Sequence, residues 1–324
     1  MKKRDKLITK NGIEIDCNIV GFVEGISGKT IVVYTTSDNE KELLASYYNL
    51  DGNKFRLEEI ENDKEWDVLE KRFEKKENKH MKITALLTGR GNNTLKDKNV
   101  LDILGKPVLY YPANAAANSA LVTDKYCSSD DEKILAAAEE CGGFKRIVRP
   151  AELALPTSQH VDCIMHALKV MEEEGNLPDI LVVLLANNVT VKTERIDDCI
   201  KMMMDDPTVT AVVPVYNDND HHPLRAKTLN PDGTLAMYEK GITGKVSTNR
   251  QDLPPCFFLS HNFWVLSVPF LKSGEEGQQP WGFMGNKILP YTIHDSIDIH
   301  DEIDLLLAKN WIEKNAKYAI NIDI

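Results

Sequence analysis

The sequence predicts an α/β protein in two parts: a small β-sheet-plus-helix domain over residues 1–78 and a larger domain with a mostly parallel sheet over residues 79–324. Three observations predict this arrangement. Apolar and polar residues alternate near the N-terminus, which is typical of half-buried strands. A charged run, residues 71–80, then resembles a helix end entering a linker. From Met81 onward, apolar runs alternate with helical patterns, which indicates parallel strands joined by helices.

Composition excludes several classes of protein. The chain has 324 residues and is 42% hydrophobic, enough for a substantial core. Its net charge of −11 argues against general binding of nucleic acid or membrane surfaces, although a nucleotide needs only a few local cations. Six cysteines without a C-x-x-C pair indicate reduced thiols. The longest apolar run, residues 180–186, is too short to span a bilayer, so we expect a cytoplasmic protein.

The first part reads as strands followed by a helix. The strand patterns cover residues 13–20, 30–36, 42–48 and 55–57. Trp66, Leu69 and Phe73 recur at helical spacing and predict a helix over residues 63–76. This order, with its Asp-Lys-Glu-Trp helix entry, resembles the small bacterial domain known as the YrzB-like family. That resemblance implies no known chemistry, and we expect an accessory or interaction module.

The second part alternates strands and helices until a polar insertion interrupts it. The expected strands cover residues 83–87, 180–185, 209–215 and 257–266. The expected helices cover residues 107–119, 132–141, 159–174, 193–204 and 305–312. The polar insertion, residues 217–251, contains two turn signals between short strand candidates. A long polar insertion in a compact domain is more often functional or interfacial than idle.

The stretch from residue 83 to residue 99 organises the second part. An apolar run ends in a polar loop that contains Gly89, Arg90, Gly91, Asn92, Asn93, Lys96, Lys98 and Asn99. Glycines let successive backbone N–H groups point at one place, while arginine and lysine supply positive charge. This composition suits an oligophosphate held at the carboxyl end of a strand. The alternative is a surface turn of glycine and asparagine with solvated lysines.

Three later clusters also carry candidate site residues. Arg149 precedes a proline that forces an extended backbone, and Arg250 opens a polar segment. Asp298 and His300 would face the same way on a strand, where they can hold one divalent cation. The alternatives are capping and solvation for Asp298 and Asp304, and a surface ion pair for Arg250.

Read together, these clusters resemble the cytidylyltransferase family that makes CMP-activated acidic sugars: the CMP-N-acylneuraminate, legionaminate and pseudaminate synthetases and, more distantly, the CMP-Kdo synthetases. That family opens with a pattern of the form R-x-G-S-K-x-x-x-x-K-N and a G-K-P turn, which Lys98, Asn99 and residues 105–107 match. Further matching blocks are residues 129–132, 149–154, 250–254 and 298–304. The resemblance covers roughly residues 81–312.

The resemblance implies a Rossmann-like nucleotidyltransferase domain with a β-rich dimerisation insertion. It implies that CTP activates an acidic nine-carbon sugar to give CMP-sugar and pyrophosphate, with Mg²⁺ or Mn²⁺ as cofactor. It also implies a homodimer whose insertion reaches the partner, while the net charge, as noted above, argues against a nucleic-acid or membrane partner. Two alternatives remain: a sugar nucleotidyltransferase of the same fold with another substrate, and a degenerate nucleotide-binding protein without catalysis.

The resemblance also implies roles for individual residues. Those implied in catalysis are Lys98, Arg90 and Asp298. Those implied in nucleotide binding are Gly89, Gly91, Asn92, Asn93, Lys96, Asn99 and Arg149, the last at the base. Those implied in sugar binding are Arg250, Gln251, Asn187 and Lys240, and Asp298 and His300 are the implied metal ligands.

The chain departs from the family pattern in three places. Aligned on Lys98, the loop has Asn92 and Asn93 where the family has Ser-Lys, and its arginine is shifted by one place. The Q-P-T-S-P block after the central strand reads Ala-Asn-Asn-Val-Thr over residues 186–190. The second metal carboxylate of the family's D-x-D is His300 here.

Overall fold

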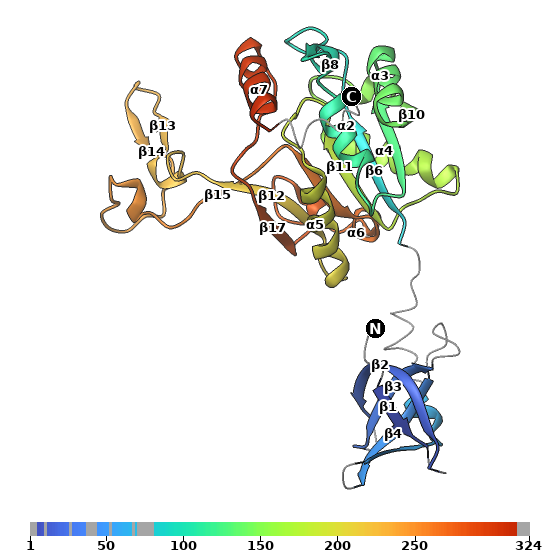
Figure 1. The fold of residues 1–324 in the computed structure, drawn as a ribbon. Coiled ribbons are helices and arrows are strands. Elements are labelled where there is room, and N and C mark those ends of the chain that lie inside the picture. The colour runs from blue at the N-terminus through green and yellow to red at the C-terminus, as the bar shows by residue number, and fades with distance from the viewer. Residues whose placement is uncertain are drawn as a thin grey trace. The chain divides into compact units, whose positions relative to one another are not determined.

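In the computed structural model the chain divides into two compact units, Met1–His80 and Met81–Ile324. We had expected the division after residue 78. The structure describes residues 5–9, 12–25, 28–36, 44–51, 54–66, 69 and 81–315. Each unit is treated by itself (Figure 1).

The first unit is a closed barrel of five strands. The strands are β1 (Asp5–Ile8), β2 (Glu14–Glu24), β3 (Thr30–Thr36), β4 (Leu44–Asp51) and β5 (Lys54–Glu58). Consecutive strands pair antiparallel, and β1 closes the barrel by pairing parallel to β5. Closure removes the free strand edges that an open sheet presents.

The sequence predicted a small β-sheet with one helix, and the structure adds that this sheet closes into a barrel. Strand β1 was not predicted, because it lies in a highly charged stretch, and its pairing of Ile8 with Arg56 is non-local. Residues 63–66 are helical, and Leu69 is buried. Phe73, most of the rest of the predicted helix and the charged run at residues 71–80 lie outside the described residues. The resemblance to the YrzB-like family stays a prediction.

The second unit is built on an eight-stranded sheet of order β10-β9-β6-β11-β16-β12-β15, in which β17 also pairs with β12. Its strands are β6 (Ile83–Thr88), β9 (Asp124–Ser129), β10 (Lys145–Val148), β11 (Ile180–Leu185), β12 (Ala211–Asn217), β15 (Phe257–Leu259), β16 (Phe263–Ser267) and β17 (Ile288–Thr292). Only β15 and β16 run against the other strands. The predicted α/β class with a mostly parallel sheet is therefore confirmed.

Helices cover both faces of this sheet (Figure 1). They are α2 (Tyr110–Ala117), α3 (Glu132–Gly142), α4 (His160–Glu173), α5 (Thr193–Asp205), α6 (Val268–Ser273) and α7 (Glu302–Lys314). Helices α2, α3 and α5 share one hydrophobic core with the sheet, and α4 and α6 share the other. Every residue of β6 is buried, as expected for a continuous apolar run between two helical layers.

Several predicted boundaries were wrong for local reasons. The helix expected from residue 107 begins at Tyr110, because Lys106–Pro107 forms strand β8 and pairs with β7 (Asp102–Ile103) across a turn at Leu104 and Gly105. The strand expected over residues 257–266 is two strands, β15 and β16. Strands β9 and β10 were not predicted, because charged and small polar residues mask their periodicity.

The polar insertion contains the antiparallel hairpin of β13 (Lys227–Leu229) and β14 (Leu235–Met237). It projects from the sheet between β12 and β15 (Figure 1). Leu229 and Leu235 on this hairpin are 70% and 69% exposed. In the described part of the chain, no helix is long and apolar enough to cross a membrane.

Candidate active site

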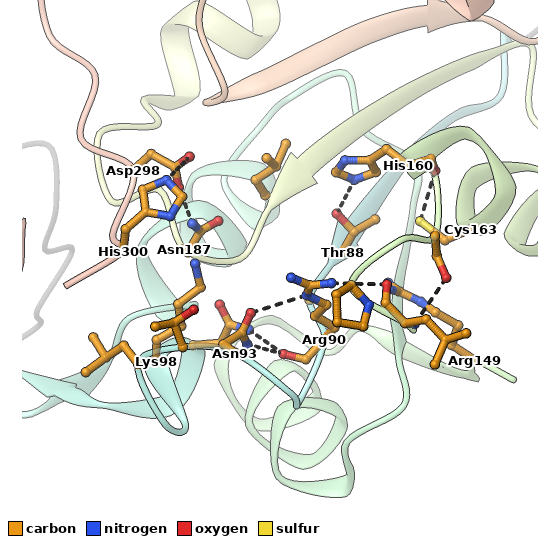
Figure 2. A pocket seen from close by; sticks show the side chains of 18 of the residues that line it. Thr88, Arg90, Asn93, Lys98, Arg149, His160, Cys163, Asn187, Asp298 and His300 are labelled. Carbon is orange, nitrogen blue, oxygen red and sulfur yellow. Dashed lines mark hydrogen bonds and ion pairs between the residues drawn. The ribbon is translucent and has the colours of Figure 1, made fainter. Parts of the chain in front are cut away.

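A cavity of about 650 Å³ lies at the carboxyl ends of β6 and β11 (Figure 2). Four stretches line it: the loop after β6, residues 149–163, the turn after β11 and the segment before α7. Carboxyl ends of parallel strands meet at one edge of a sheet, where α/β proteins bind ligands. The volume is in the usual range for a small-molecule site.

The loop after β6 is held in shape by its asparagines. Asn93 and Asn99 both donate from Nδ2 to the carbonyl oxygen of Arg90, the second over 3.2 Å. Asn99 is buried, whereas the Arg90 guanidinium lines the cavity and donates to the carbonyl of Leu155 over 3.1 Å. Figure 2 shows Arg90 and Asn93 together at this loop. The asparagines therefore fix the turn from which Arg90 projects.

Two glycines in this loop are closely packed, Gly91 more tightly than Gly89. A Cβ at Gly89 would lie 3.1 Å from the Cβ of Ala186, and one at Gly91 would lie 2.6 Å from Oδ2 of Asp131. The Gly91 N–H donates to Asp130 Oδ1 over 3.0 Å. That donor is satisfied within the protein, so the loop offers fewer backbone N–H groups to a phosphate than its glycine content predicted.

Lys98 joins the loop to the far end of the domain. Its Nζ donates to the carbonyl oxygen of Ile299 over 2.8 Å. Burial lowers the pKa of Lys98, and the nearby Asp298 carboxylate partly offsets this effect. A partly desolvated ammonium acts more strongly on a ligand anion than a solvated one does.

Asp298 is the most connected acidic group in the cavity. Asn187 donates from Nδ2 to its Oδ1. Its Oδ2 lies 3.1 Å from Nε2 of His300 and 3.7 Å from Nδ1 of His261. Helix capping, which was an alternative for both acids, applies to Asp304, whose carboxylate accepts from backbone N–H groups at the start of α7.

The donor set at Asp298 suits one cation shared with substrate. Mg²⁺ is usually bound through one or two carboxylates together with phosphate oxygens and water, which fits Asp298. Imidazole nitrogen suits transition metals better, so His300 fits Mg²⁺ poorly as a ligand. Within the described ranges, no group of three or more His, Cys, Asp and Glu side chains is arranged to hold a metal ion.

Arg149 is held rigidly at the cavity wall. Its side chain donates from Nε to Ser128 Oγ over 3.2 Å and from a terminal nitrogen to the Ser128 carbonyl over 2.7 Å. The residue is only 7% exposed. Since Ser128 lies near the carboxyl end of β9, the sheet itself sets the direction of this guanidinium.

His160 is a cavity residue that the sequence argument missed. Its Nε2 lies 3.1 Å from Thr88 Oγ1, and that hydroxyl donates its single proton to the Leu184 carbonyl. His160 therefore carries its proton on Nε2 and leaves Nδ1 as an acceptor. Burial lowers the pKa of His160 to about 4, and the charge of Arg149 adds to the effect. No spacing or motif marks this residue in the sequence.

His261 was also missed. Its Nδ1 faces Asp298, whereas its neighbour Asn262 is fully buried. The two residues lie in the turn between β15 and β16, where His261 is exposed and Asn262 is buried. No sequence signal connects this turn to Asp298.

The structure brings together only part of the predicted site. The predicted residues that line the cavity are Gly89, Arg90, Asn93, Lys98, Asn99, Arg149, Asn187, Asp298 and His300. Those that do not line it are Gly91, Asn92, Lys96, Lys240, Arg250 and Gln251. The last three belong to the insertion, where Arg250 and Arg225 share the carboxylate of Asp220. Lys240, Arg250 and Gln251 were expected to bind the sugar, but they do not line the cavity of their own chain.

The layered sheet and the cavity at its carboxyl edge define the second unit as an α/β domain with a site for a small molecule. A similar solved structure is CMP:2-keto-3-deoxy-manno-octonic acid synthetase complexed with CTP, with a TM-score of 0.53 at 15% identity over 72% of this chain and 99% of that one. Another is 4-diphosphocytidyl-2C-methyl-D-erythritol synthase from Anaerococcus prevotii, with a TM-score of 0.51 at 12% identity over 72% and 97%.

Residues 90–243 match the family model described as cytidylyltransferase. Pseudaminic acid cytidylyltransferase of Campylobacter jejuni is 28% identical over 31% of this chain and 43% of its own length. N-acylneuraminate cytidylyltransferase of Escherichia coli is 23% identical over 74% and 54%. CMP-N,N'-diacetyllegionaminic acid synthase of Legionella pneumophila is 22% identical over 72% and 98%.

Residues 90–243 of the second unit are thus similar to cytidylyltransferases, in line with the resemblance noted from the sequence. The chain spans about half the length of the first curated relatives it matches.

Proposed function

We propose that this protein is a nucleotidyltransferase that couples CTP to an acidic nine-carbon sugar, releasing pyrophosphate and supplying CMP-sugar for cell-surface glycans. The observation that carries the proposal is the grouping of Arg90, Lys98 and Asp298 around one cavity in a cytidylyltransferase-family domain. The relatives named for pseudaminic, N-acylneuraminic and diacetyllegionaminic acids support the choice of sugar class.

The reaction places negative charge where the cavity has cations. The sugar hydroxyl oxygen bonds to the α-phosphorus, the bond from that phosphorus to the pyrophosphate oxygen breaks, and the hydroxyl proton leaves. Such transfers depend mainly on positioning and charge stabilisation. Lys98 would act at the α-phosphate, Arg90 at the outgoing phosphates, and the Asp298 carboxylate on the hydroxyl proton.

Bound Mg²⁺ or Mn²⁺ would neutralise phosphate charge and favour pyrophosphate as a leaving group. Asp298 would hold it, with Asn187 keeping the carboxylate oriented through its amide. Arg149 and neutral His160, on the opposite wall, offer a donor pair and an acceptor suited to a nucleobase edge.

The sugar carboxylate needs a cation that the cavity does not provide. Its arginine and lysine lining, within the part of the chain that is described, consists of Arg90, Arg149 and Lys98, all of which the nucleotide would use. Arg250 and Lys240 lie instead on the projecting insertion. We therefore include a cytoplasmic homodimer in the proposal, in which the insertion of one copy reaches the cavity of the other.

Two alternatives rest on specific observations. A 3-deoxy-manno-octulosonate cytidylyltransferase of Geotalea uraniireducens is 27% identical over 131 residues, which favours testing an eight-carbon acid as well. The Gly91 N–H, satisfied by Asp130, favours testing a protein that binds CTP without turnover.

The test is a pyrophosphate-release screen of the four nucleoside triphosphates against nine- and eight-carbon acidic sugars, with Mg²⁺ and with Mn²⁺. We expect release with CTP and a nine-carbon acid, and its loss by a factor of about 100 or more in Asp298→Asn. Calorimetric binding of CTP without release for any pair would identify the non-catalytic alternative. Release with another base or only with the eight-carbon acid would redefine the substrate.

A further inference from the structure

Five polar side chains form a closed ring of hydrogen bonds next to the segment that carries Asp298. They come from three separate stretches of the chain: the turn after β11, the turn between β15 and β16, and the segment before α7. The members are Asn188, Thr190, Ser260, Asn262 and Ser296. Ser296 is exposed, and the other four are at most 1% exposed.

The donors of the ring run in one direction. Asn262 donates from Nδ2 to Thr190 Oγ1 over 2.8 Å, and Thr190 donates to Asn188 Oδ1 over 2.7 Å. Asn188 donates to Ser296 Oγ over 3.4 Å. Because Ser260 uses its proton on Asn262 Oδ1, Ser296 must donate to Ser260 over the 2.8 Å between their oxygens.

In a ring of this kind every hydroxyl proton is used and no amide oxygen is left unpaired. Each hydroxyl donates once and accepts at least once, and each amide uses both of its polar atoms. Hydrogen bonds that polarise one another in a buried, low-dielectric region reinforce one another. Opening the ring at one member leaves buried groups unpaired on both sides of the gap.

The ring contacts the Asp298 segment at several points. Ser296 is itself a member, two residues before Asp298. The N–H of Ile297 donates to Thr190 Oγ1 over 3.4 Å. Asn188 and Asp298 form an isolated antiparallel bridge, and the N–H of Ile299 donates to the carbonyl of Asn187 over 3.0 Å. The backbone on both sides of Asp298 is thus tied to the turn after β11.

From this geometry we infer that the ring positions Asp298, and that Thr190 and Asn262 are positioning residues for the reaction. This inference rests on the proposed function. Thr190 is the junction, since its hydroxyl donates to one ring member, accepts from another and accepts from the Asp298 segment. Neither residue lines the cavity, so both act through Asp298 and its partner Asn187.

The experiment compares Thr190→Val, which keeps the shape and removes the hydroxyl, with Thr190→Ser, which keeps the hydroxyl. The control for stability alone is Ile200→Ala, a fully buried position on α5. We expect Thr190→Val to lower kcat by 10- to 100-fold while the KM for CTP changes by less than about twofold, because a misplacement near 1 Å costs this much. Thr190→Ser should restore kcat to within about threefold of the unchanged protein.

Crystal structures of the same variants give a readout that does not need turnover. Contact between Asn187 and Asp298 should be lost in Thr190→Val and kept in Ile200→Ala. If Thr190→Val only lowers the melting temperature, as Ile200→Ala does, and leaves both kcat and Asp298 in place, the inference is overturned. If the unchanged protein releases no pyrophosphate, the proposed function fails, and the structures still decide whether the ring sets the position of Asp298.

Discussion

Lys98 donates from Nζ to the carbonyl oxygen of Ile299 over 2.8 Å, a contact between residues 201 positions apart in the chain. Ile299 is fully buried and directly follows Asp298. The contact therefore ties the cation of the loop after β6 to the backbone beside the principal carboxylate. The Lys98 ammonium and the Asp298 carboxylate are therefore both fixed by the backbone at residues 298–299.

Replacing Lys98 tests its place at the α-phosphate. We expect Lys98→Ala to lower kcat/KM for CTP by about 100- to 1,000-fold, because a preorganised charge near the transferred group is lost. Steady-state pyrophosphate release measures this. Lys169→Ala on the exposed face of α4 is the matched control and should stay within twofold of the unchanged protein. Unchanged turnover in Lys98→Ala would remove Lys98 from the mechanism.

His160 predicts how stability depends on pH. Its pKa is about 4 in the folded protein against an ordinary 6.5, so between these values the unfolded chain binds a proton that the folded protein does not. Above pH 6.5, His160 therefore does not reduce the free energy of unfolding. As the pH drops from 6.5 towards 4, this residue lowers the free energy of unfolding by up to about 3 kcal/mol.

Urea unfolding near neutral pH and near pH 5 measures this contribution. We expect His160→Gln to lose less stability than the unchanged protein on going to the lower pH, by about 2 kcal/mol. His294→Gln, at an exposed position, is the control and should follow the unchanged protein. Parallel curves for all three proteins would show that His160 is not held neutral.

Arg149 and Arg146 form a matched pair close to one another in sequence. Arg149 is buried and makes two hydrogen bonds to Ser128, whereas Arg146 pairs on the surface with Glu132 and Glu139. Lysine cannot reproduce both donors of a fixed guanidinium. We expect Arg149→Lys to cost about 1–3 kcal/mol of unfolding free energy and to weaken CTP binding.

Arg146→Lys should cost less than about 0.5 kcal/mol and leave CTP affinity unchanged. Thermal unfolding and calorimetry with CTP distinguish the two variants. If both variants changed the unfolding free energy and the CTP affinity equally, the Ser128 contacts would not orient the Arg149 guanidinium for CTP binding.

Gly91 is predicted to resist substitution for a steric reason. A Cβ there would lie 2.6 Å from Oδ2 of Asp131, the residue that caps α3 through the N–H of Lys133. We expect Gly91→Ala to destabilise the domain by about 1–3 kcal/mol, because the cap or the loop must move. Gly241→Ala, with its nearest contact at an ordinary 3.5 Å, should change the melting temperature little. An unchanged melting temperature in Gly91→Ala would show that the Asp131 side chain can move away without loss of stability.

The sequence alone predicted the layers of the second unit and its resemblance to cytidylyltransferases. Long apolar runs such as those of β6 and β11 predict buried strands because both faces of a parallel sheet are covered. Motifs such as Lys98-Asn99 and Arg149-Pro are local, so they can be recognised without a structure. The strands that were missed, β9 and β10, are short and carry charged or small polar side chains, and their pairing rather than their composition makes them strands.

Only the tertiary structure decided which candidates share a site. It placed Lys98, Asp298, Arg149 and His160 around one cavity, and it left Gly91, Lys96 and Arg250 outside that cavity. It also brought His261 next to Asp298. It also closed the N-terminal strands into a barrel. A helix or strand can be predicted from local sequence because the spacing of its apolar side chains repeats within a few residues. A site depends on contacts between segments far apart, such as Lys98 with Ile299, and periodicity contains no information about them.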